Sequence, residues 1–351
     1  MIVALAAACG HGGERDTDGG VRPDAAVPPP PMTKAYLFDD TIGIYRLSKD
    51  ATTGALAVAD PTPIPAAEAA WGTTNQQGTH LYALARFARQ ILDFTIEPDG
   101  RLTPGPVLDV TPCWPTRAVL HPHGDALAVA CDSGYVVALP VHPDGTLGSP
   151  QVLAAGRSPV SATFTADGRC LYVADVDGFN SDPEAQLRMY RFDSGAPVLV
   201  GTFAGPRVTW SVAAHPRDDL VFAAGAYLVE SYAVGQDCAL TRVGSAATGP
   251  NTYQVTVAPS GDRLFVTGTD VSVFEIATGG ALSPIPGNPF LQKSLTMFGA
   301  IMDPGMPTLL YITGGAFEGI VTAVIARDGS VTEGPFLHAG MRGNDWVQLA
   351  P

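Results

Sequence analysis

The sequence predicts an all-β fold, a seven-bladed β-propeller made of four-stranded blades. The main observation is a repeated phrase: a turn containing Gly or Asp, then Leu, then an apolar run. Its leucines follow one another at steps of 46, 44, 49, 44 and 46 residues, at Leu81, Leu127, Leu171, Leu220, Leu264 and Leu310. A degenerate seventh copy covers 35–38. Such a period is typical of one propeller blade, and the 3.6-residue apolar periodicity of amphipathic helices is absent throughout.

One repeat, over 115–153, shows how each blade is assembled. A tight turn at 122–125 and an Asp-Gly hairpin at 144–147 punctuate the apolar runs. The expected strands cover 116–121, 126–131, 135–141 and a fourth beginning at 151. The same order of strands and turns recurs in the other repeats, which supports one domain over 34–351.

The C-terminus predicts how the ring closes. Residues 344–351 match 250–259, which form a first strand, yet no second strand follows them. The repeat that opens at Ala35 lacks a first strand of its own. Pairing Val347 with the strand containing Tyr36 completes the seventh blade and removes two open sheet edges.

The first 33 residues are expected to lie outside the propeller. Residues 1–9 are apolar and end at Cys9, and they resemble the tail of a bacterial lipoprotein signal peptide, which predicts lipid attachment at Cys9. The alternative is a disordered Ala-rich terminus. The basic residues that open such a signal are absent, which leaves open a start upstream of Met1. Residues 10–33, rich in Gly, Asp and Pro, suit a tether. The prediction is a periplasmic or surface lipoprotein of a bacterial cell envelope.

Charge and motifs exclude several function classes. The net charge is −14, and no Lys/Arg run exists that could follow a nucleic-acid backbone. No run reaches the roughly 20 apolar residues of a membrane span, so membrane contact is expected only through the lipid. Nucleophile-elbow, phosphate-loop and His-Glu-x-x-His motifs are absent. We expect a monomer without a cofactor.

Four cysteines remain beyond Cys9, and their pairing is left open by the sequence. None belongs to a Cys-x-x-Cys pair, which disfavours zinc. Antiparallel pairing places Cys131 opposite Thr116, three residues past Cys113, so a disulfide there requires the chain to curl back. That disulfide is not favoured, and one between Cys170 and Cys238 is favoured less.

Ligands of propellers usually bind where the first strands begin. Aligning these strands gives one ring of seven positions and a second ring of their preceding neighbours. The ligand-binding candidates from both rings are Trp71, Arg117, Trp210, Tyr253, Gln254, Phe298 and Trp346. Aromatic faces with one cation suit a small molecule, a sugar or a peptide. The alternative is that the aromatic side chains only wedge between blades.

One acidic loop is a weak candidate for calcium. Residues 175–184 carry oxygen ligands at alternate positions, namely Asp175, Asp177, Asn180 and Asp182. Gly178 comes too early for an EF-hand, and Phe179 fills a ligand slot. A solvated acidic loop is the favoured interpretation, and no metal is expected.

The repeats also resemble a known family. The stretch from Leu120 to Ala130, with its His-Pro-x-Gly turn, and the Asp-Gly-x-Leu hairpins are similar to the 6-phosphogluconolactonase-like propellers and the related Tyr-Val-Thr-Asn repeat propellers. The resemblance covers about 34–351. Members often carry an Asn-Arg pair after a second strand, and Ala85-Arg86 stands in that place here.

Two hypotheses for function follow. The first is a non-catalytic module that binds a ligand or partner at the mouth of the propeller. The second, implied by the resemblance, is a lactone hydrolase, which needs a base to activate water and a cation to hold the carbonyl oxygen. Arg117 and Arg86 are the candidate cations, and Asp345 is the only carboxylate of the two rings.

Overall fold

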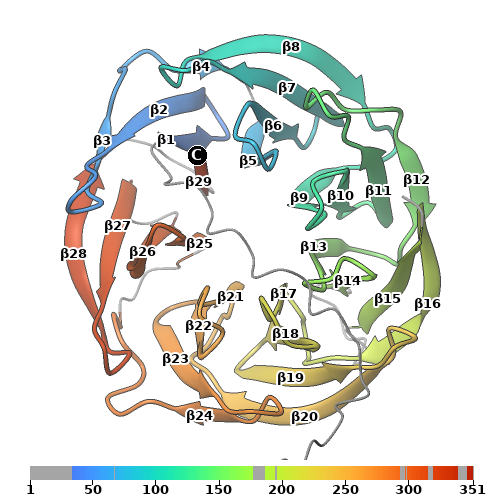
Figure 1. The fold of residues 1–351 in the computed structure, drawn as a ribbon, viewed down its shortest axis with the longest axis vertical. Coiled ribbons are helices and arrows are strands. Elements are labelled where there is room, and N and C mark those ends of the chain that lie inside the picture. Colours follow the sequence, from blue (N-terminus) through green and yellow to red (C-terminus); the bar gives the residue numbers. More distant parts are fainter. Residues whose placement is uncertain are drawn as a thin grey trace, which may run out of the picture.

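The fold is a ring of seven sheets, each a blade of a β-propeller (Figure 1). The computed structural model describes residues 34–66, 68–176, 186–193, 196–292, 297, 299–314, 319–338 and 346–350. All regular elements among these residues are strands. The predicted all-β, seven-bladed fold is therefore confirmed.

The strands of the first three blades have the following bounds. Blade 1 contains β29 (Trp346–Ala350), β1 (Lys34–Asp39), β2 (Gly43–Lys49) and β3 (Leu56–Val58), with the short β4 (Ile64–Pro65) beside β2. Blade 2 contains β5 (Ala69–Thr74), β6 (His80–Ala85), β7 (Gln90–Ile96) and β8 (Leu102–Asp109). Blade 3 contains β9 (Pro115–Leu120), β10 (Ala126–Cys131), β11 (Tyr135–Pro140) and β12 (Gln151–Ala154).

Blades 4 to 7 repeat this order. Blade 4 contains β13 (Pro159–Phe164), β14 (Cys170–Asp175), β15 (Gln186–Asp193) and β16 (Ala196–Ala204). Blade 5 contains β17 (Ser211–Ala214), β18 (Leu220–Gly225), β19 (Leu228–Val234) and β20 (Leu240–Ala247). Blade 6 contains β21 (Gln254–Val257), β22 (Arg263–Thr267), β23 (Val271–Ile276) and β24 (Leu282–Pro284). Blade 7 contains β25 (Gly299–Asp303), β26 (Met306–Gly314), β27 (Gly319–Ile325) and β28 (Val331–His338).

The C-terminal strand closes the ring as the sequence predicts. β29 pairs antiparallel with β1, and Val347 lies opposite Leu37 in this pairing. The first and last segments of the folded part therefore share one sheet (Figure 1). The pairing gives β1 a partner on its inner side, and β29 becomes the innermost strand of the blade, as the first strands of the other blades are.

The core lies between the blades. Second strands such as β6 and β10 are buried along their whole length, whereas the outer strand β8 is mostly exposed. Because side chains alternate across a strand, each blade offers an apolar face to both neighbours. One such cluster joins Tyr82 and Leu84 of blade 2 to Leu127 and Val129 of blade 3.

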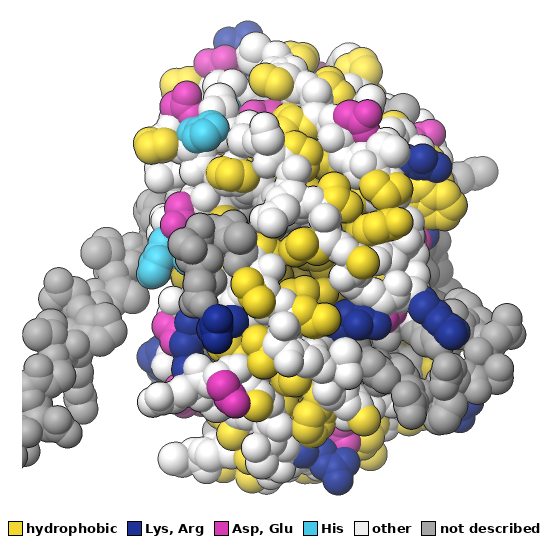
Figure 2. Space-filling view, turned by 90° about the vertical axis from the view of Figure 1, so that its right-hand side faces the viewer, with side chains coloured by type: hydrophobic (Ala, Val, Ile, Leu, Met, Phe, Trp, Pro, Cys, Tyr) yellow, Lys and Arg dark blue, Asp and Glu magenta, His cyan; other side chains and the backbone are white. Residues whose placement is uncertain are grey.

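The outer strands form the rim of the disc. Figure 2 looks onto the rim of blades 3 and 4, where hydrophobic side chains lie scattered among uncharged ones. Strand β16 exposes Val198, Leu199 and Val200 there. Among the described residues, no helix is long and apolar enough to cross a membrane.

Buried tyrosines fasten each of four blades to the next. Each hydroxyl donates to a carbonyl in the hairpin between the third and fourth strands of the following blade, at 2.6–2.9 Å. The pairs are Tyr36 with Gly100, Tyr82 with Gly145, Tyr172 with Cys238, and Tyr311 with Gly54. Burial raises the pKa of these four hydroxyls, so they stay protonated donors.

We expect Tyr82→Phe to lower the free energy of unfolding by about 1–2 kcal/mol, because it removes a buried hydrogen bond and leaves the Gly145 carbonyl without this donor. Tyr190→Phe is the matched control. The Tyr190 hydroxyl is buried and has no hydrogen-bond partner among the described atoms, so its removal should be neutral or stabilising. Urea unfolding measures both variants, and equal losses would contradict the proposed fastening.

The structure overturns both cysteine expectations, since Cys113 bonds to Cys131 and Cys170 to Cys238, with Cα atoms 5.1 and 5.6 Å apart. In the first pair a register shift places Cys131 opposite Pro115 rather than Thr116. A turn that joins the Cys113 amide to the Val110 carbonyl at 2.8 Å brings the chain back. Simple antiparallel counting misses both features.

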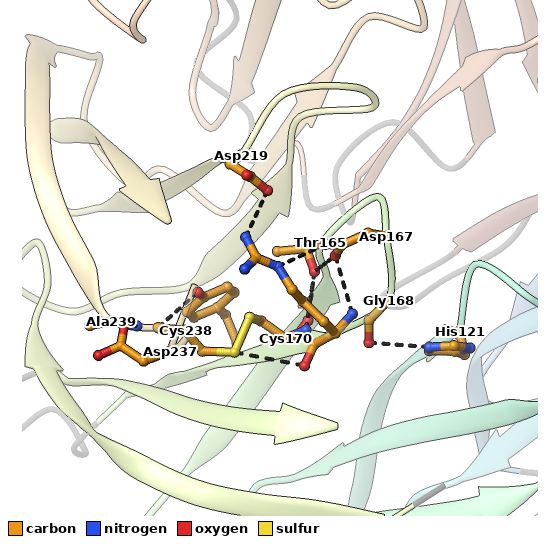
Figure 3. Close-up of a disulfide and its surroundings, with 11 residues drawn as sticks. His121, Thr165, Asp167, Gly168, Cys170, Asp219, Asp237, Cys238 and Ala239 are labelled. Carbon is orange, nitrogen blue, oxygen red and sulfur yellow. Dashed lines mark hydrogen bonds and ion pairs between the residues drawn. A yellow bond between two sulfur atoms is a disulfide. The ribbon is translucent and has the colours of Figure 1, made fainter. Parts of the chain in front are cut away.

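The second disulfide follows from the way hairpins reach the neighbouring blade. Cys238 lies in the β19–β20 hairpin of blade 5, where its carbonyl accepts from Tyr172 of β14 (Figure 3). The hairpin thereby comes to the start of β14, where Cys170 lies. Denatured, unreduced protein should yield no free thiol from these four cysteines in a thiol titration. A free pair would contradict the structure.

Candidate functional site

The candidate site lies on the face where the first strands begin, called the upper face here. The seven aligned first-strand positions lie at one level, because each pairs with the last or next-to-last residue of its second strand. The turns between second and third strands lie on the same face. The alignment made from the sequence therefore gave the correct register.

Three of these positions stack across blades 1 to 3. The rings of Trp346 and Trp71 have centroids 3.3 Å apart, and the guanidinium of Arg117 lies 4.7 Å from the Trp71 ring centroid. Trp346 Nε1 also donates to the Gly72 carbonyl at 3.1 Å. A Cβ at Gly299 would lie 2.9 Å from the Trp346 ring, so that position needs a glycine. We call Trp346, Trp71 and Arg117 the Trp–Trp–Arg stack.

The guanidinium of Arg117 has no counter-charge among the described residues. No hydrogen bond or ion pair joins it to any of them, and its close neighbour is the Trp71 ring. The side chain keeps some accessible surface, yet the blades enclose it, and this desolvation lowers the pKa of Arg117 to about 10. It therefore stays charged at neutral pH. An enclosed cation that only a ring face stabilises is suited to a negatively charged or strongly polar ligand atom.

Two charged residues lie one step farther up than the stack, just past the ends of the second strands of blades 2 and 3. Arg86 lies two residues beyond Leu84, the partner of Trp71, and Asp132 lies two residues beyond Ala130, the partner of Arg117. Arg86 and Asp132 form an ion pair, and burial lowers the pKa of Arg86. The Arg86 amide donates to the carbonyl of Glu68 at 3.3 Å.

Several buried polar atoms of this region have no hydrogen-bond partner among the described atoms. They are Trp71 Nε1, Arg86 Nε, Glu68 Oε2 and Asp132 Oδ1. Buried polar atoms are normally paired, and exceptions often mark places that bind water or a ligand. Four such atoms lie in two neighbouring blades, one of them on Trp71 beside Arg117, and they make this part of the upper face the candidate site.

The other sequence-predicted residues are placed differently. Trp210 and Tyr253, of blades 5 and 6, lie together with ring centroids 5.6 Å apart. The amide of Gln254 is held at both ends by Ala300, at 2.7 and 3.0 Å, which joins blades 6 and 7. Phe298 and Asp345 lie outside the described residues, as does Cys9.

The calcium candidates are only partly described. Asp177, Asn180 and Asp182 lie outside the described residues. The Asp175 carboxylate accepts from the amide of Ser158 at 2.7 Å and from the Arg188 guanidinium at 3.2 Å. These contacts give Asp175 a structural role in holding the start of β13.

Sequence reasoning missed Glu68 and Asp132. The signal was present, because Asp132 stands in the same place after its second strand as Arg86 does in the preceding blade. Aligning those turns would have paired the two charges. Glu68 precedes its first strand and shows no repeat pattern.

A hollow on the opposite face, between blades 6 and 7, is a weaker candidate. Ser260, Arg263 and Thr308 line part of it. Arg263 lies 3.3 Å from Glu275 and 3.4 Å from Asp262, so its charge is already balanced. The buried polar atoms of Trp71, Arg86, Glu68 and Asp132 that have no hydrogen-bond partner among the described atoms lie on the upper face instead.

Comparison with known proteins identifies the fold. No family model matches the chain, and no curated protein matches its sequence. A candidate 6-phosphogluconolactonase from Bacteroides uniformis superposes with a TM-score of 0.77 at 12% identity, over 90% of this chain and 99% of that one. A periplasmic gluconolactonase from Pseudomonas aeruginosa gives 0.73 at 16% identity, over 91% and 100%.

A candidate 6-phosphogluconolactonase from Bacteroides fragilis gives a TM-score of 0.73 at 14% identity, over 91% of this chain and 98% of that one. The resemblance carried by the repeats is thus confirmed at the level of the fold. At such identities the likeness leaves function to be argued from the site.

Proposed function

We propose that the upper face of blades 1 to 3 binds a small polyhydroxylated ligand bearing a carbonyl or carboxylate oxygen, such as an aldonolactone or its aldonate. The observation that carries this proposal is the enclosed cation of Arg117 on the Trp71 ring. A ligand oxygen beside that guanidinium replaces the water that burial removes.

The neighbouring groups fit the same chemistry. Trp346 is buried and stacks on Trp71, and Arg117 lies over the Trp71 ring, so the apolar area offered to a sugar is the part of Trp71 that these two leave exposed. Trp71 Nε1 is a buried donor without an acceptor among the described atoms, and Glu68 Oε2 and Asp132 Oδ1 are buried acceptors without a donor there. Ligand hydroxyl groups would supply both kinds of partner. Polyols carry both donors and acceptors, whereas a purely apolar ligand would leave all three atoms unpaired.

Hydrolysis of a lactone bound there is the second candidate. In this reaction a water oxygen attacks the carbonyl carbon, the ring C–O bond breaks, and the ring oxygen leaves as a hydroxyl. Arg117 would stabilise the oxyanion, and Asp132, Glu68 or Asp345 would take the proton from water. The fold shared with a gluconolactonase and the unpaired carboxylate oxygens favour this candidate.

We also propose that the chain acts outside the cytoplasm, attached through a lipid on Cys9. The two disulfides support this location, because such bonds persist in oxidising compartments. Mass spectrometry of the mature N-terminus tests the proposal. Recovery of an unmodified Met1 from the cytoplasm would end it.

Binding is tested by calorimetry and tryptophan fluorescence with gluconate and glucono-δ-lactone. We expect Trp71→Phe to weaken binding about tenfold, because it removes a donor and part of the ring face. Trp210→Phe changes the aromatic pair of blades 5 and 6 and is the control. Equal effects in the two variants would refute the assignment to blades 1 to 3.

Hydrolysis is tested separately with a panel of sugar and aliphatic lactones. We expect Asp132→Asn, Glu68→Gln or Asp345→Asn to reduce kcat about a hundredfold or more, as loss of a general base does. Binding with no turnover of any lactone by the parent protein would leave the binding proposal standing and remove the hydrolase.

A further inference from the structure

A second cluster of chemically active side chains lies on the lower face, in the turn between β9 and β10. The sequence there is His121-Pro122-His123-Gly124-Asp125. One ligand atom from each of His121, His123 and Asp125 lies within 4.8 Å of the other two. The Gly124 amide donates to the His121 carbonyl at 2.7 Å, and this tight turn brings the three side chains together.

His121 is held rigidly in this turn. The residue is buried, and its ring lies 5.0 Å from Phe164 and 5.2 Å from Phe192, centroid to centroid. Its Nε2 donates to the Gly168 carbonyl of blade 4 at 3.1 Å (Figure 3). A histidine that binds a metal commonly donates its second ring nitrogen to a carbonyl in this way, which fixes the tautomer and the ring orientation.

With Nε2 carrying the proton, the neutral ring turns the lone pair of Nδ1 towards Asp125. Nδ1 and the Asp125 carboxylate oxygen lie 2.6 Å apart. Two acceptors at that separation repel each other unless a cation lies between or beside them. The cation is either a second proton on His121 or a metal ion that the exposed imidazole of His123 also reaches.

The corresponding histidine of blade 5 shows the contrast. His215 likewise directs Nε2 to a carbonyl, that of Gly261, at 2.8 Å. Its Nδ1, however, accepts from the backbone amide of Asp218 at 2.8 Å, so its lone pair is already used. Arg217 stands where blade 3 has His123. The arrangement in blade 3 is therefore not a necessity of the fold.

We propose that Nδ1 of His121, an imidazole nitrogen of His123 and a carboxylate oxygen of Asp125 form a site for a divalent late transition-metal ion, Zn²⁺ or Cu²⁺. Imidazole with one carboxylate suits these ions better than Mg²⁺ or Ca²⁺, which prefer oxygen ligands. Three protein ligands leave at least one position for water. The site lies on the face opposite the Trp–Trp–Arg stack and is independent of the function proposed there.

Calorimetric titration of the untagged full chain with Zn²⁺, alongside Cu²⁺ titration followed by electron paramagnetic resonance, tests the proposal. We expect one ion per chain, nitrogen hyperfine structure on bound Cu²⁺, and a higher melting temperature with metal. His123→Ala and Asp125→Asn should each weaken binding about tenfold or more. Both residues are exposed, so the variants should fold.

Two controls separate this site from other donors. His142→Ala removes an exposed histidine of the same blade and should bind as the parent does. The double variant C9S/H11A removes the N-terminal thiol and imidazole and should also bind unchanged. Unaltered affinity in both His123→Ala and Asp125→Asn, or no saturable binding with metal in large excess, would overturn the proposal.

Discussion

Arg117→Met is expected to abolish binding of gluconate while raising the free energy of unfolding. Burial lowers the pKa of Arg117 to about 10, so the folded protein holds this charge at a cost. Each pKa unit corresponds to about 1.4 kcal/mol, and the lost contact with the Trp71 ring offsets about 1 kcal/mol. We expect a net stabilisation of roughly 2–3 kcal/mol. A residue that costs stability yet carries binding is characteristic of a functional site.

The pH dependence gives an independent check on the same residue. The folded-state pKa is lowered, so the unfolded chain holds more protons between about pH 10 and the ordinary pKa of arginine. The destabilisation by Arg117 is therefore complete below about pH 10 and decreases as the pH rises above it. Urea unfolding should show a constant difference between variant and parent near neutral pH and a smaller one in strong alkali.

Arg89→Met is the matched control for the loss of a cation–π contact. Arg89 lies 5.8 Å from the Trp114 ring on the same face, and unlike Arg117 it has a carboxylate close enough to interact with its charge, that of Asp109. Its replacement should remove a cation–π contact without relieving a buried charge, so stability should fall slightly or stay unchanged. A parent-like affinity for gluconate in Arg117→Met would end the assignment of the site.

Replacement of Cys170 and Cys238 by serine is expected to destabilise the propeller more than replacement of Cys113 and Cys131. The first bridge spans 68 residues and the second 18. Loop-closure entropy gives about 4 kcal/mol for the longer loop and about 3 kcal/mol for the shorter. The longer bridge also joins two blades, whereas the shorter one joins β10 to the segment that enters the same blade.

Midpoints of urea unfolding for the two double variants, with the reduced parent as reference, measure this difference. The Tyr172 hydroxyl still reaches the Cys238 carbonyl after substitution, because that bond uses the backbone. The blades should therefore keep their contact, and the loss should reflect the missing bridge. A larger loss in the Cys113 and Cys131 variant would contradict the order.

The candidate site was only partly predictable. Trp71, Arg117 and Trp346 fall on one ring because strand register can be counted from the repeat. Their stacking, and the enclosure of Gln254 by Ala300, depend on which direction each side chain takes between blades. Counting along a strand gives the level of a residue but no information about its neighbour in the next blade.

The sequence by itself determined the blade number, the strand order and the closing strand, because period, turn residues and alternation act within one repeat. Tertiary structure alone decided what happens between repeats. It brought the hairpin carrying Cys238 to Cys170, and it enclosed Arg117 without a counter-charge among the described residues. Contacts between blades join residues far apart in the chain, and their geometry depends on the packing of whole sheets, which no local pattern encodes.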